Sequence, residues 1–262
     1  MSSTLLIQSY KDGPRPLWIE RCLESAQQLC AIRQWHYLFI GDELFKPLPR
    51  DFVFKVGNRG PILSDLGRLL ACKEALHEYD QVIWLDADTL IFNPQAFTLP
   101  KGQFGFGQER WVQPASSKKG SLTNRSKWTI YRSACNALCY FERENPFLDF
   151  YIYTCQSIIR RVDPDRIAPQ MIGPKLLTAL HSIAQLPLTT SIGSASPHLI
   201  IDLSLDEGEA LNKHRQDVLN GEPEAGLNLC HSLINTSTYR DELMTENHIL
   251  GAVEQLIARG QV

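Results

Sequence analysis

The chain has 262 residues and a formal net charge of -3 at pH 7, with 44% hydrophobic and 21% charged residues. This composition is typical of a folded globular protein and excludes a disordered or fibrous chain. The chain lacks the excess of Lys and Arg that nucleic-acid binders need to displace counterions from phosphates, so we exclude nucleic acid as a partner.

The apolar stretches and the cysteines of the sequence bear on membrane contact and on disulfide bonds. No apolar stretch of the sequence is long enough to cross a bilayer, and residues 1–10 lack a basic region followed by a long apolar segment. We therefore expect a cytoplasmic protein without an integral membrane segment, with peripheral membrane contact left open. The seven cysteines lie in apolar segments without CxxC spacing, which favours buried free thiols over a zinc site or disulfides.

The N-terminal third alternates between strand and helix patterns. A short apolar run predicts a strand at residues 5–10, helical spacing predicts a helix at 17–32, and aromatic and branched residues predict a strand at 36–41. We expect a third strand at 52–56 and a helix over 65–78, with Ser64 as its N-cap.

The most informative segment is VIWLDADTLIF, in which two aspartates separated by one residue stand between two apolar runs. A buried strand is expected to end at these carboxylates. Alternating strands and helices of this kind predict an α/β fold with a mostly parallel central sheet flanked by helices.

Later elements follow from the same patterns. Polar residues predict a surface loop at 109–129, mobile around 116–126. The sequence shows no internal repeat or strong linker, so one domain over residues 1–262 is expected. The other expected elements are strands at 102–107, 133–142, 196–203 and 227–234, and helices at 146–161, at 169–184 with an interruption near Gly173 and Pro174, and at 241–259.

Asp86 and Asp88 are the candidate catalytic and metal-binding residues. Two carboxylates this close repel each other unless a cation or hydrogen-bond donors neutralise them, and a bend at the strand end lets them face a ligand. Mg²⁺ and Mn²⁺ prefer oxygen ligands from one or two carboxylates plus substrate phosphates, so a metal bridged to a diphosphate fits the pair. The alternative is structural: one aspartate caps the next loop and the other makes a surface hydrogen bond.

The motifs resemble those of the GT-A glycosyltransferases, within the DxD group that includes initiating α-mannosyltransferases and the sugar-binding DxD regions of bacterial toxins. The helix LSDLGRLLACKEAL, with Ser64, Asp65, Arg68 and Leu69, is similar to the family's helix before the metal motif. VIWLDADTLIF then looks like the motif itself, at the expected short distance. The opening IQSYKDGPRPLWIERCLES and the later QMIGPKLLTAL resemble the first strand and helix and a Gly-Pro helix start.

The resemblance implies a Rossmann-like GT-A fold and a hexosyltransferase that uses Mn²⁺ or Mg²⁺ and a UDP- or GDP-sugar. It implies a nucleotide-sugar-binding half at about 1–107 and an acceptor-binding half at about 108–262, for a glycan, lipid-linked or small-molecule acceptor, and it favours a retaining outcome. Gln8, Ser9 and Tyr10 would contact the nucleoside. The residues expected to bind the donor are Gln8, Ser9, Tyr10, Ser64, Asp65, Arg68, Asp86, Ala87, Asp88 and Asn136. Asn136 is added because a side-chain amide at a strand end is able to contact sugar hydroxyls, and its alternative is an amide with partners inside the fold.

Several further residues have both a functional and a structural interpretation. NLCHSLIN supplies His231 where the family often completes its metal shell, although its neighbours depart from that motif. Asp163, Asp165 and Gln170 are candidates to face the reacting sugar, with Asp165 and Gln170 as catalytic candidates, but Asp-Pro-Asp is also a turn. Trp111 would stack on a sugar ring or anchor its loop.

Two other functions stay open on the sequence alone. DADTL also fits the nucleophile pattern of a haloacid dehalogenase-like Mg²⁺-dependent phosphatase, although that class places the pattern on its first strand and needs a later acidic pair. A non-catalytic nucleotide-sugar-binding protein would bind without turnover.

Overall fold

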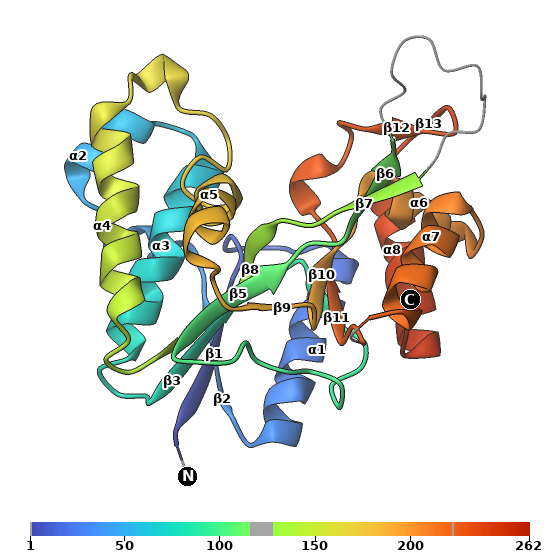
Figure 1. Cartoon of the computed structure of the whole chain (residues 1–262), viewed down its shortest axis with the longest axis horizontal. Helices are drawn as coiled ribbons and strands as arrows, with labels where there is room; N and C mark the ends of the chain where they lie inside the picture. The colour runs from blue at the N-terminus through green and yellow to red at the C-terminus, as the bar shows by residue number, and fades with distance from the viewer. Residues whose placement is uncertain (1, 116–127, 222) are drawn as a thin grey trace.

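In the computed structural model, which describes residues 2–115, 128–221 and 223–262, a six-stranded sheet forms the centre of the molecule (Figure 1). β1 pairs in parallel with β2 and β3, and β5 with β9, whereas β8 is antiparallel to β3 and β5. Five of the six strands therefore run the same way, which confirms the mostly parallel sheet. The strand order is β2 (His36–Ile40), β1 (Thr4–Ser9), β3 (Gln81–Leu85), β8 (Ala134–Glu142), β5 (Phe104–Gln108) and β9 (Leu188–Thr189).

Helices flank both faces of this sheet, as expected. Leu5 and Ile7 of β1 point to one face and belong to the core that includes residues of α2 to α5, while Leu6 points to the other face and packs with α1. This alternation is the two-residue period of a strand buried on both sides. The helices are α1 (Leu17–Arg33), α2 (Arg50–Val56), α3 (Gly60–Ala75), α4 (Pro146–Arg161) and α5 (Pro174–Ala184), with short 3-10 helices η1 (Asp42–Phe45) and η2 (Pro164–Arg166).

A second, three-stranded sheet joins one strand from the first half of the chain to two strands from the second half. Its order is β10 (Ile192–Ser194), β11 (Gly226–Asn228) and β4 (Thr89–Ile91). The chain therefore leaves the main sheet after β3, and β4 pairs antiparallel with β11, about 135 residues later in the sequence. Around it lie α6 (Pro197–Leu205), α7 (Glu209–Leu219) and α8 (Glu246–Arg259) (Figure 1). Smaller elements are the hairpins β6 (Trp111–Pro114) with β7 (Trp128–Tyr131) and β12 (Thr238–Tyr239) with β13 (Glu242–Leu243), and η3 (His231–Leu233).

The two chain halves share these sheets, since β8 lies between β3 and β5 and β4 pairs with β11. The division into a donor half and an acceptor half stays a prediction.

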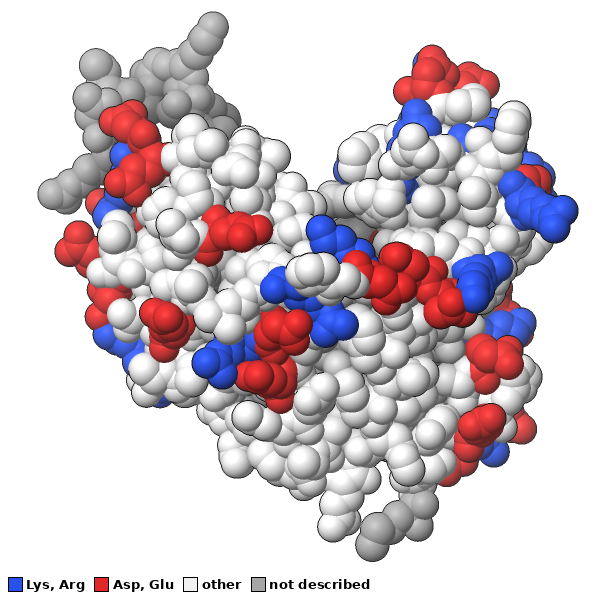
Figure 2. All heavy atoms as spheres, turned by 180° about the vertical axis from the view of Figure 1, so that it is seen from behind, with Lys and Arg blue, Asp and Glu red and all other residues white. Residues whose placement is uncertain are grey.

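Seen from behind, the surface is deeply hollowed between the lobe that carries α2 and α4 and the lobe that carries α6 to α8 (Figure 2).

The expected third strand at 52–56 is wrong, because these residues form the helix α2. Pro49 stands just before the helix, Asp51 lies in its first turn, and Gly57, with φ +61°, ends it. A short apolar run alone does not distinguish a strand from a helix. Ser64 is also not an N-cap: α3 begins four residues earlier, at Gly60, with Pro61 in its first turn, so Ser64 lies inside the helix.

The expected strand at 196–203 is likewise wrong, because it is α6. The Ser196 side chain caps this helix by accepting a hydrogen bond from the Leu199 N–H, and Pro197 begins it. The helix is apolar on nearly all sides because it is buried, which hides the helical period. The predicted strand at 227–234 is shorter than expected: β11 ends at Asn228, and Cys230, with φ 49°, turns the chain into η3.

Three other boundaries shift. The expected loop at 109–129 contains the strand β6, and its expected mobile part at 116–126 lies outside the described residues. The helix expected at 169–184 begins only at Pro174, and the closing helix begins at Glu246 after the Thr245 capping box. The helix expected at 65–78 ends at Ala75, and the remaining predicted strands and helices are confirmed within about two residues.

All seven cysteines are free and six are buried, as expected; Cys230 is half-buried. Among the described residues, no helix combines the length and apolar character that a membrane crossing requires.

A leucine pair tests the double-sided burial of β1. Leu6 is 0% exposed, whereas Leu219 at the end of α7 is 85% exposed. We expect Leu6→Ala to lower the free energy of unfolding by about 2–5 kcal/mol through lost transfer energy and a cavity. Leu219→Ala should change it by less than about 0.5 kcal/mol. Urea unfolding followed by circular dichroism measures both, and equal losses would contradict the core described above.

Candidate functional site

The two aspartates lie on a tight turn at the carboxyl end of β3. The Thr89 N–H donates to the Asp86 carbonyl at 3.0 Å, which closes the turn and sends the chain into β4 of the second sheet. The Asp86 N–H donates to the Ala137 carbonyl at 2.8 Å, and the buried Gln8 amide donates to the Asp86 carbonyl at 3.3 Å. The turn is therefore fixed by both neighbouring strands, and a bend at the strand end is confirmed.

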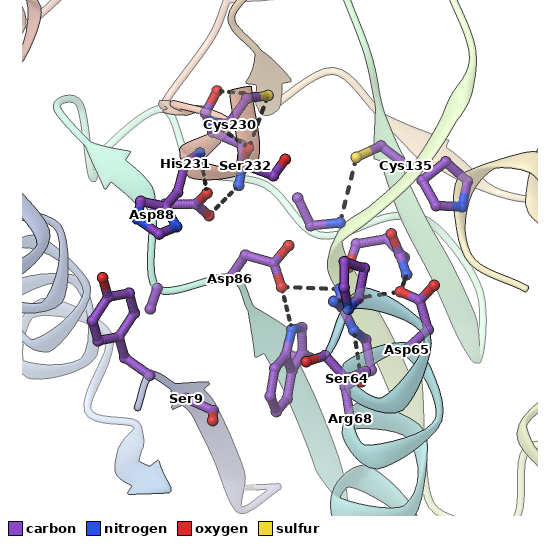
Figure 3. A pocket seen from close by; sticks show the side chains of 18 of the residues that line it. Ser9, Ser64, Asp65, Arg68, Asp86, Asp88, Cys135, Cys230, His231 and Ser232 are labelled. Carbon is purple, nitrogen blue, oxygen red and sulfur yellow. Dashed lines mark hydrogen bonds and ion pairs between the residues drawn. The ribbon is translucent and has the colours of Figure 1, made fainter. Parts of the chain in front are cut away.

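The Asp86 carboxylate is directed toward α3 (Figure 3). Its Oδ1 accepts a hydrogen bond from Trp84 Nε1 at 2.7 Å and forms an ion pair with Arg68 Nη1 at 2.9 Å. The side chain keeps 26% of its surface exposed. Asp86 thus has one oxygen held by fixed donors on an otherwise accessible carboxylate.

Arg68 joins three segments behind Asp86. Its Nη1 also donates to the Asn136 carbonyl at 2.6 Å, and its Nη2 lies 3.5 Å from Asp65 Oδ1. The Asn136 side-chain amide donates to that same Asp65 oxygen at 2.8 Å. Burial opposes the charge of Arg68, but Asp86 and Asp65 raise its pKa above the ordinary value, so the guanidinium stays charged.

Asp65 is itself nearly inaccessible. Burial raises its pKa from 3.8 to about 6, against the lowering effect of Arg68 and of the Asn136 hydrogen bond. Gly173 explains how α5 starts so close to this group. A Cβ at Gly173 would lie 2.6 Å from Asp65 Oδ2 and 2.8 Å from Asn136 Nδ2, so a glycine is required there.

The Asp88 carboxylate is directed to the opposite side, toward the segment after β11 (Figure 3). Its Oδ1 accepts from Asn228 Nδ2 at 2.7 Å, and its Oδ2 accepts from the His231 backbone N–H at 2.9 Å. Burial and the nearby Asp86 charge raise the pKa of Asp88, while these hydrogen bonds lower it. A cation beside Asp88 would relieve the cost of keeping it ionised.

A cavity of about 380 Å³ opens over this turn. Most of the residues predicted for donor binding, metal binding or catalysis line it together, from β1, α3, the turn, β8, the segment before α5 and the segment after β11. They are Ser9, Tyr10, Ser64, Asp65, Arg68, Asp86, Ala87, Asp88, Asn136, Gln170 and His231.

Gln8, Asp163 and Asp165 lie outside this cavity. Gln8 is 0% exposed and lies beneath the turn, where the Tyr37 hydroxyl donates to the side-chain oxygen of Gln8, so Gln8 supports the turn from below. Asp165 lies exposed on η2 with Asp163 just before it, and neither lines this cavity. The Asp-Pro-Asp segment forms a turn there, which was the structural interpretation of these residues.

His231 and the two aspartates do not form a ready metal cage. Within residues 2–115, 128–221 and 223–262, no group of three or more His, Cys, Asp or Glu side chains is placed to hold a metal ion. The His231 ring packs against Tyr10 and Trp18, with ring centroids 5.9 and 5.7 Å away. Asp86 and Asp88 both line the cavity, and carboxylate oxygens are ligands that Mg²⁺ prefers together with phosphates, so these two residues are the ones able to hold a divalent cation there.

Sequence reasoning missed several residues of the site. Asn228 stands opposite Thr89 in the β11–β4 pairing, and this long-range pairing brings its amide to Asp88. Trp84 occupies the position two residues before Asp86, where an indole N–H is able to reach the carboxylate. Glu109, Cys135 and Ser194 also line the cavity. Of these, Trp84 alone carried a local signal, its place within the motif segment.

No protein-family model matches the chain, and no curated protein matches it either. A solved glycosyltransferase involved in glycosylation of the major capsid of PBCV-1 is 10% identical with a TM-score of 0.46, over 95% of this chain and 98% of that one. The apo form of the glycosyltransferase GlyE of Streptococcus pneumoniae TIGR4 is 10% identical with a TM-score of 0.39, over 100% and 65%. The catalytic domain of Drosophila beta1,4galactosyltransferase 7, with xylobiose, is 12% identical with a TM-score of 0.29, over 64% and 66%. These likenesses are distant, and the chemistry of the site rests on its own residues.

The buried Asp65 gives a pH prediction. The folded protein binds the Asp65 proton more tightly than the unfolded chain, so ionisation between pH 3.8 and about 6 costs stability as the pH rises. Asp65→Asn does not titrate, and its amide oxygen is still able to accept from Asn136. We expect the stability of this variant relative to wild type to increase over that interval by on the order of 3 kcal/mol.

Urea unfolding between about pH 4 and pH 7 measures this difference. Asp149→Asn on α4 is the matched control, because that side chain is 72% exposed. Parallel pH curves for wild type and Asp65→Asn would show that Asp65 has no raised pKa.

Proposed function

We propose that the chain is a metal-dependent glycosyltransferase that moves a sugar, a hexose by the resemblance, from a nucleotide-sugar donor to an acceptor hydroxyl. The observation that carries the proposal is the turn of Asp86 and Asp88 at the end of a buried strand. Both carboxylates face an open cavity, and each has an oxygen held by fixed donors. In α/β sheets such strand ends are where ligands bind.

The charges of the cavity support a cation. Its described lining carries five carboxylates, and only Lys11 and Arg68 oppose them with a permanent positive charge. Arg68 is already engaged with Asp86 and Asp65. A diphosphate would be repelled by this surface unless a divalent ion accompanied it. The five carboxylates belong to Asp42, Asp65, Asp86, Asp88 and Glu109.

Asp86 and Asp88 would hold Mn²⁺ or Mg²⁺, with His231 as a further proposed ligand. When bound, the ion supplies Lewis-acid stabilisation of the charge on the leaving diphosphate. Ser9 and Tyr10 would contact the nucleoside of a UDP- or GDP-sugar, and Ser64 and Asn136 would offer hydrogen bonds to the sugar or phosphates. Asp65 and Arg68 hold Asn136 and Asp86 in place for this task.

At the anomeric carbon of the donor sugar, the transfer forms one bond and breaks one. The acceptor hydroxyl oxygen bonds to the anomeric carbon, and the bond from that carbon to the phosphate oxygen breaks, with its electron pair leaving on the diphosphate. In the retaining outcome that the resemblance favours, the hydroxyl proton passes to the leaving phosphate on the same face, so no protein base is required.

Asp88 gives the direct test. We expect wild type to be stabilised in a thermal-shift panel of UDP- and GDP-sugars only when Mn²⁺ and the correct donor are both present, by about 2.7 kcal/mol at a concentration 100 times the Kd. Asp88→Asn should lose this stabilisation and slow transfer by at least about 100-fold, because it removes charge stabilisation at the leaving group. The variant should still fold without ligand, with a loss of about 1–3 kcal/mol, because one of the two Asp88 oxygens that accept hydrogen bonds becomes an NH2 group.

Asp149→Asn, a change of the same type on the surface of α4, should respond like wild type. A folded Asp88→Asn protein with normal metal-dependent turnover would refute the proposed role. Binding of the donor without any turnover would identify a binding protein instead, and metal-dependent hydrolysis of p-nitrophenyl phosphate without donor binding would identify a phosphatase.

A further inference from the structure

A second cavity lies beside the first, against one face of the β6–β7 hairpin. Trp111 of β6 and Tyr131 of β7 are direct cross-strand partners, and the Glu109 N–H donates to the Ser133 carbonyl at 2.9 Å just before them. Alternate side chains of paired strands share a face, so these four residues form one surface. All four line the second cavity.

The intervening residues anchor the other face of the hairpin to α7. Arg110 is 2% exposed, and its Nε lies 3.4 Å from Asp217 Oδ2 while its Nη1 lies 3.2 Å from Glu224 Oε1. Arg132 binds the same Asp217 carboxylate at 2.5 Å. Thus the residue just before Trp111 and the residue just after Tyr131 converge on one carboxylate. This ionic anchor fixes the base of the hairpin and with it the two aromatic side chains.

The start of α5 forms the opposite wall. Pro174, Lys175 and Thr178 line the cavity from this helix, preceded by Gln170. The cavity measures about 440 Å³, and Glu109, Gln170 and Pro174 also line the cavity over Asp86 and Asp88. The two spaces are therefore neighbours that share part of one wall, and a group bound in one is able to reach the other.

The residues of this second cavity match a sugar ring. Two aromatic side chains offer flat apolar surface for the C–H face of a pyranose. A carboxylate, a primary amide, two hydroxyls and an ammonium surround them and are able to pair with sugar hydroxyls. The combination of a few convergent polar groups with aromatic surface is typical of a small-molecule site.

We propose that this cavity is the acceptor subsite, and that it takes the acceptor as a pyranose ring against Trp111 and Tyr131 with its hydroxyls on the Glu109 side. The proposal rests on the proposed glycosyl transfer. Glu109 lines both cavities and already accepts a hydrogen bond from the Ser133 hydroxyl, so its carboxylate is placed to orient the acceptor hydroxyl toward the donor. Asp217 is a positioning residue, because it acts only through the two arginines.

Sugar binding is measured first, without turnover. Saturation-transfer NMR is recorded on the full chain with UDP or GDP and the diamagnetic Mg²⁺, using the methyl pyranosides of glucose, galactose, mannose and N-acetylglucosamine as probes. At least one should bind wild type, and Trp111→Ala and Tyr131→Ala should each weaken it by at least about tenfold, as for buried aromatic contacts in interfaces. Trp111→Phe should keep part of the binding. Phe54→Ala and Tyr153→Ala, at positions 91% and 65% exposed outside both cavities, are the matched controls.

Turnover then separates this proposal from the proposed function. Trp111→Ala should raise the acceptor KM while the donor KM and the acceptor-independent hydrolysis of the donor stay at wild-type values. Asp217→Asn should raise the acceptor KM in the same way, with the metal-dependent thermal shift intact, which a general loss of structure would not allow.

Wild-type binding of no methyl pyranoside, or unchanged binding and transfer in Trp111→Ala and Tyr131→Ala, would overturn the acceptor subsite alone. A wild-type protein that neither binds nor hydrolyses any nucleotide sugar would overturn the proposed function, whatever the sugar-binding result.

Discussion

The buried guanidinium of Arg68 is the interaction on which the candidate site depends. It reaches from α3 to the Asp86 carboxylate on the turn after β3 and to the Asn136 carbonyl on β8. Removing it would leave Asp65 and Asp86 without their cation, and Asp65 is almost fully buried. Breaking a buried pair in this way costs about 3–5 kcal/mol, because the remaining charge is left uncompensated. Arg68 therefore lets two carboxylates stay close to each other while only Asp86 keeps substantial exposure.

The turn of Asp86 and Asp88 also marks the place where the chain passes from the main sheet into the second one. Asp86 is fixed by neighbours in β1, β8 and α3, whereas Asp88 is fixed by the last residue of β11 and by the segment that follows it. The spacing of the two carboxylates thus depends on how the two sheets meet. A ligand bound to both would link the two sheets, which is why ligand binding is expected to stabilise the whole chain.

The central sheet and the place of Asp86 and Asp88 at a strand end could be predicted because their signals are local: a buried strand is a continuous apolar run, and charged residues directly after the run mark its end. The helix α6 could not, because a short apolar segment buried on most sides shows no period. The helix α2 could not for another reason: the exposed Val53 and Phe54 stand between the buried Phe52 and Val56, so the sequence reads as one apolar run. Asn228 escaped prediction for another reason. Its role follows from the antiparallel pairing of β11 with β4, and the residues around Asn228 in the sequence give no sign of this pairing. Gln8 was expected in the cavity, and only the register of β1 shows that it faces the underside of the turn.

Because side chains alternate between the two faces of a strand, the β6–β7 hairpin has one face that packs on α7 and another that lines the second cavity. Arg110, Val112 and Arg132 face α7, where Val112 is 0% exposed and the arginines share Asp217. Trp111 and Tyr131 face the second cavity. The ionic anchor lies on the other face from Trp111 and Tyr131, and among the described residues of β6 and β7 none forms a hydrogen bond or ion pair with Asp86 or Asp88. If the cavity takes an acceptor, its choice of sugar is therefore able to change independently of the residues that would bind the metal and the diphosphate.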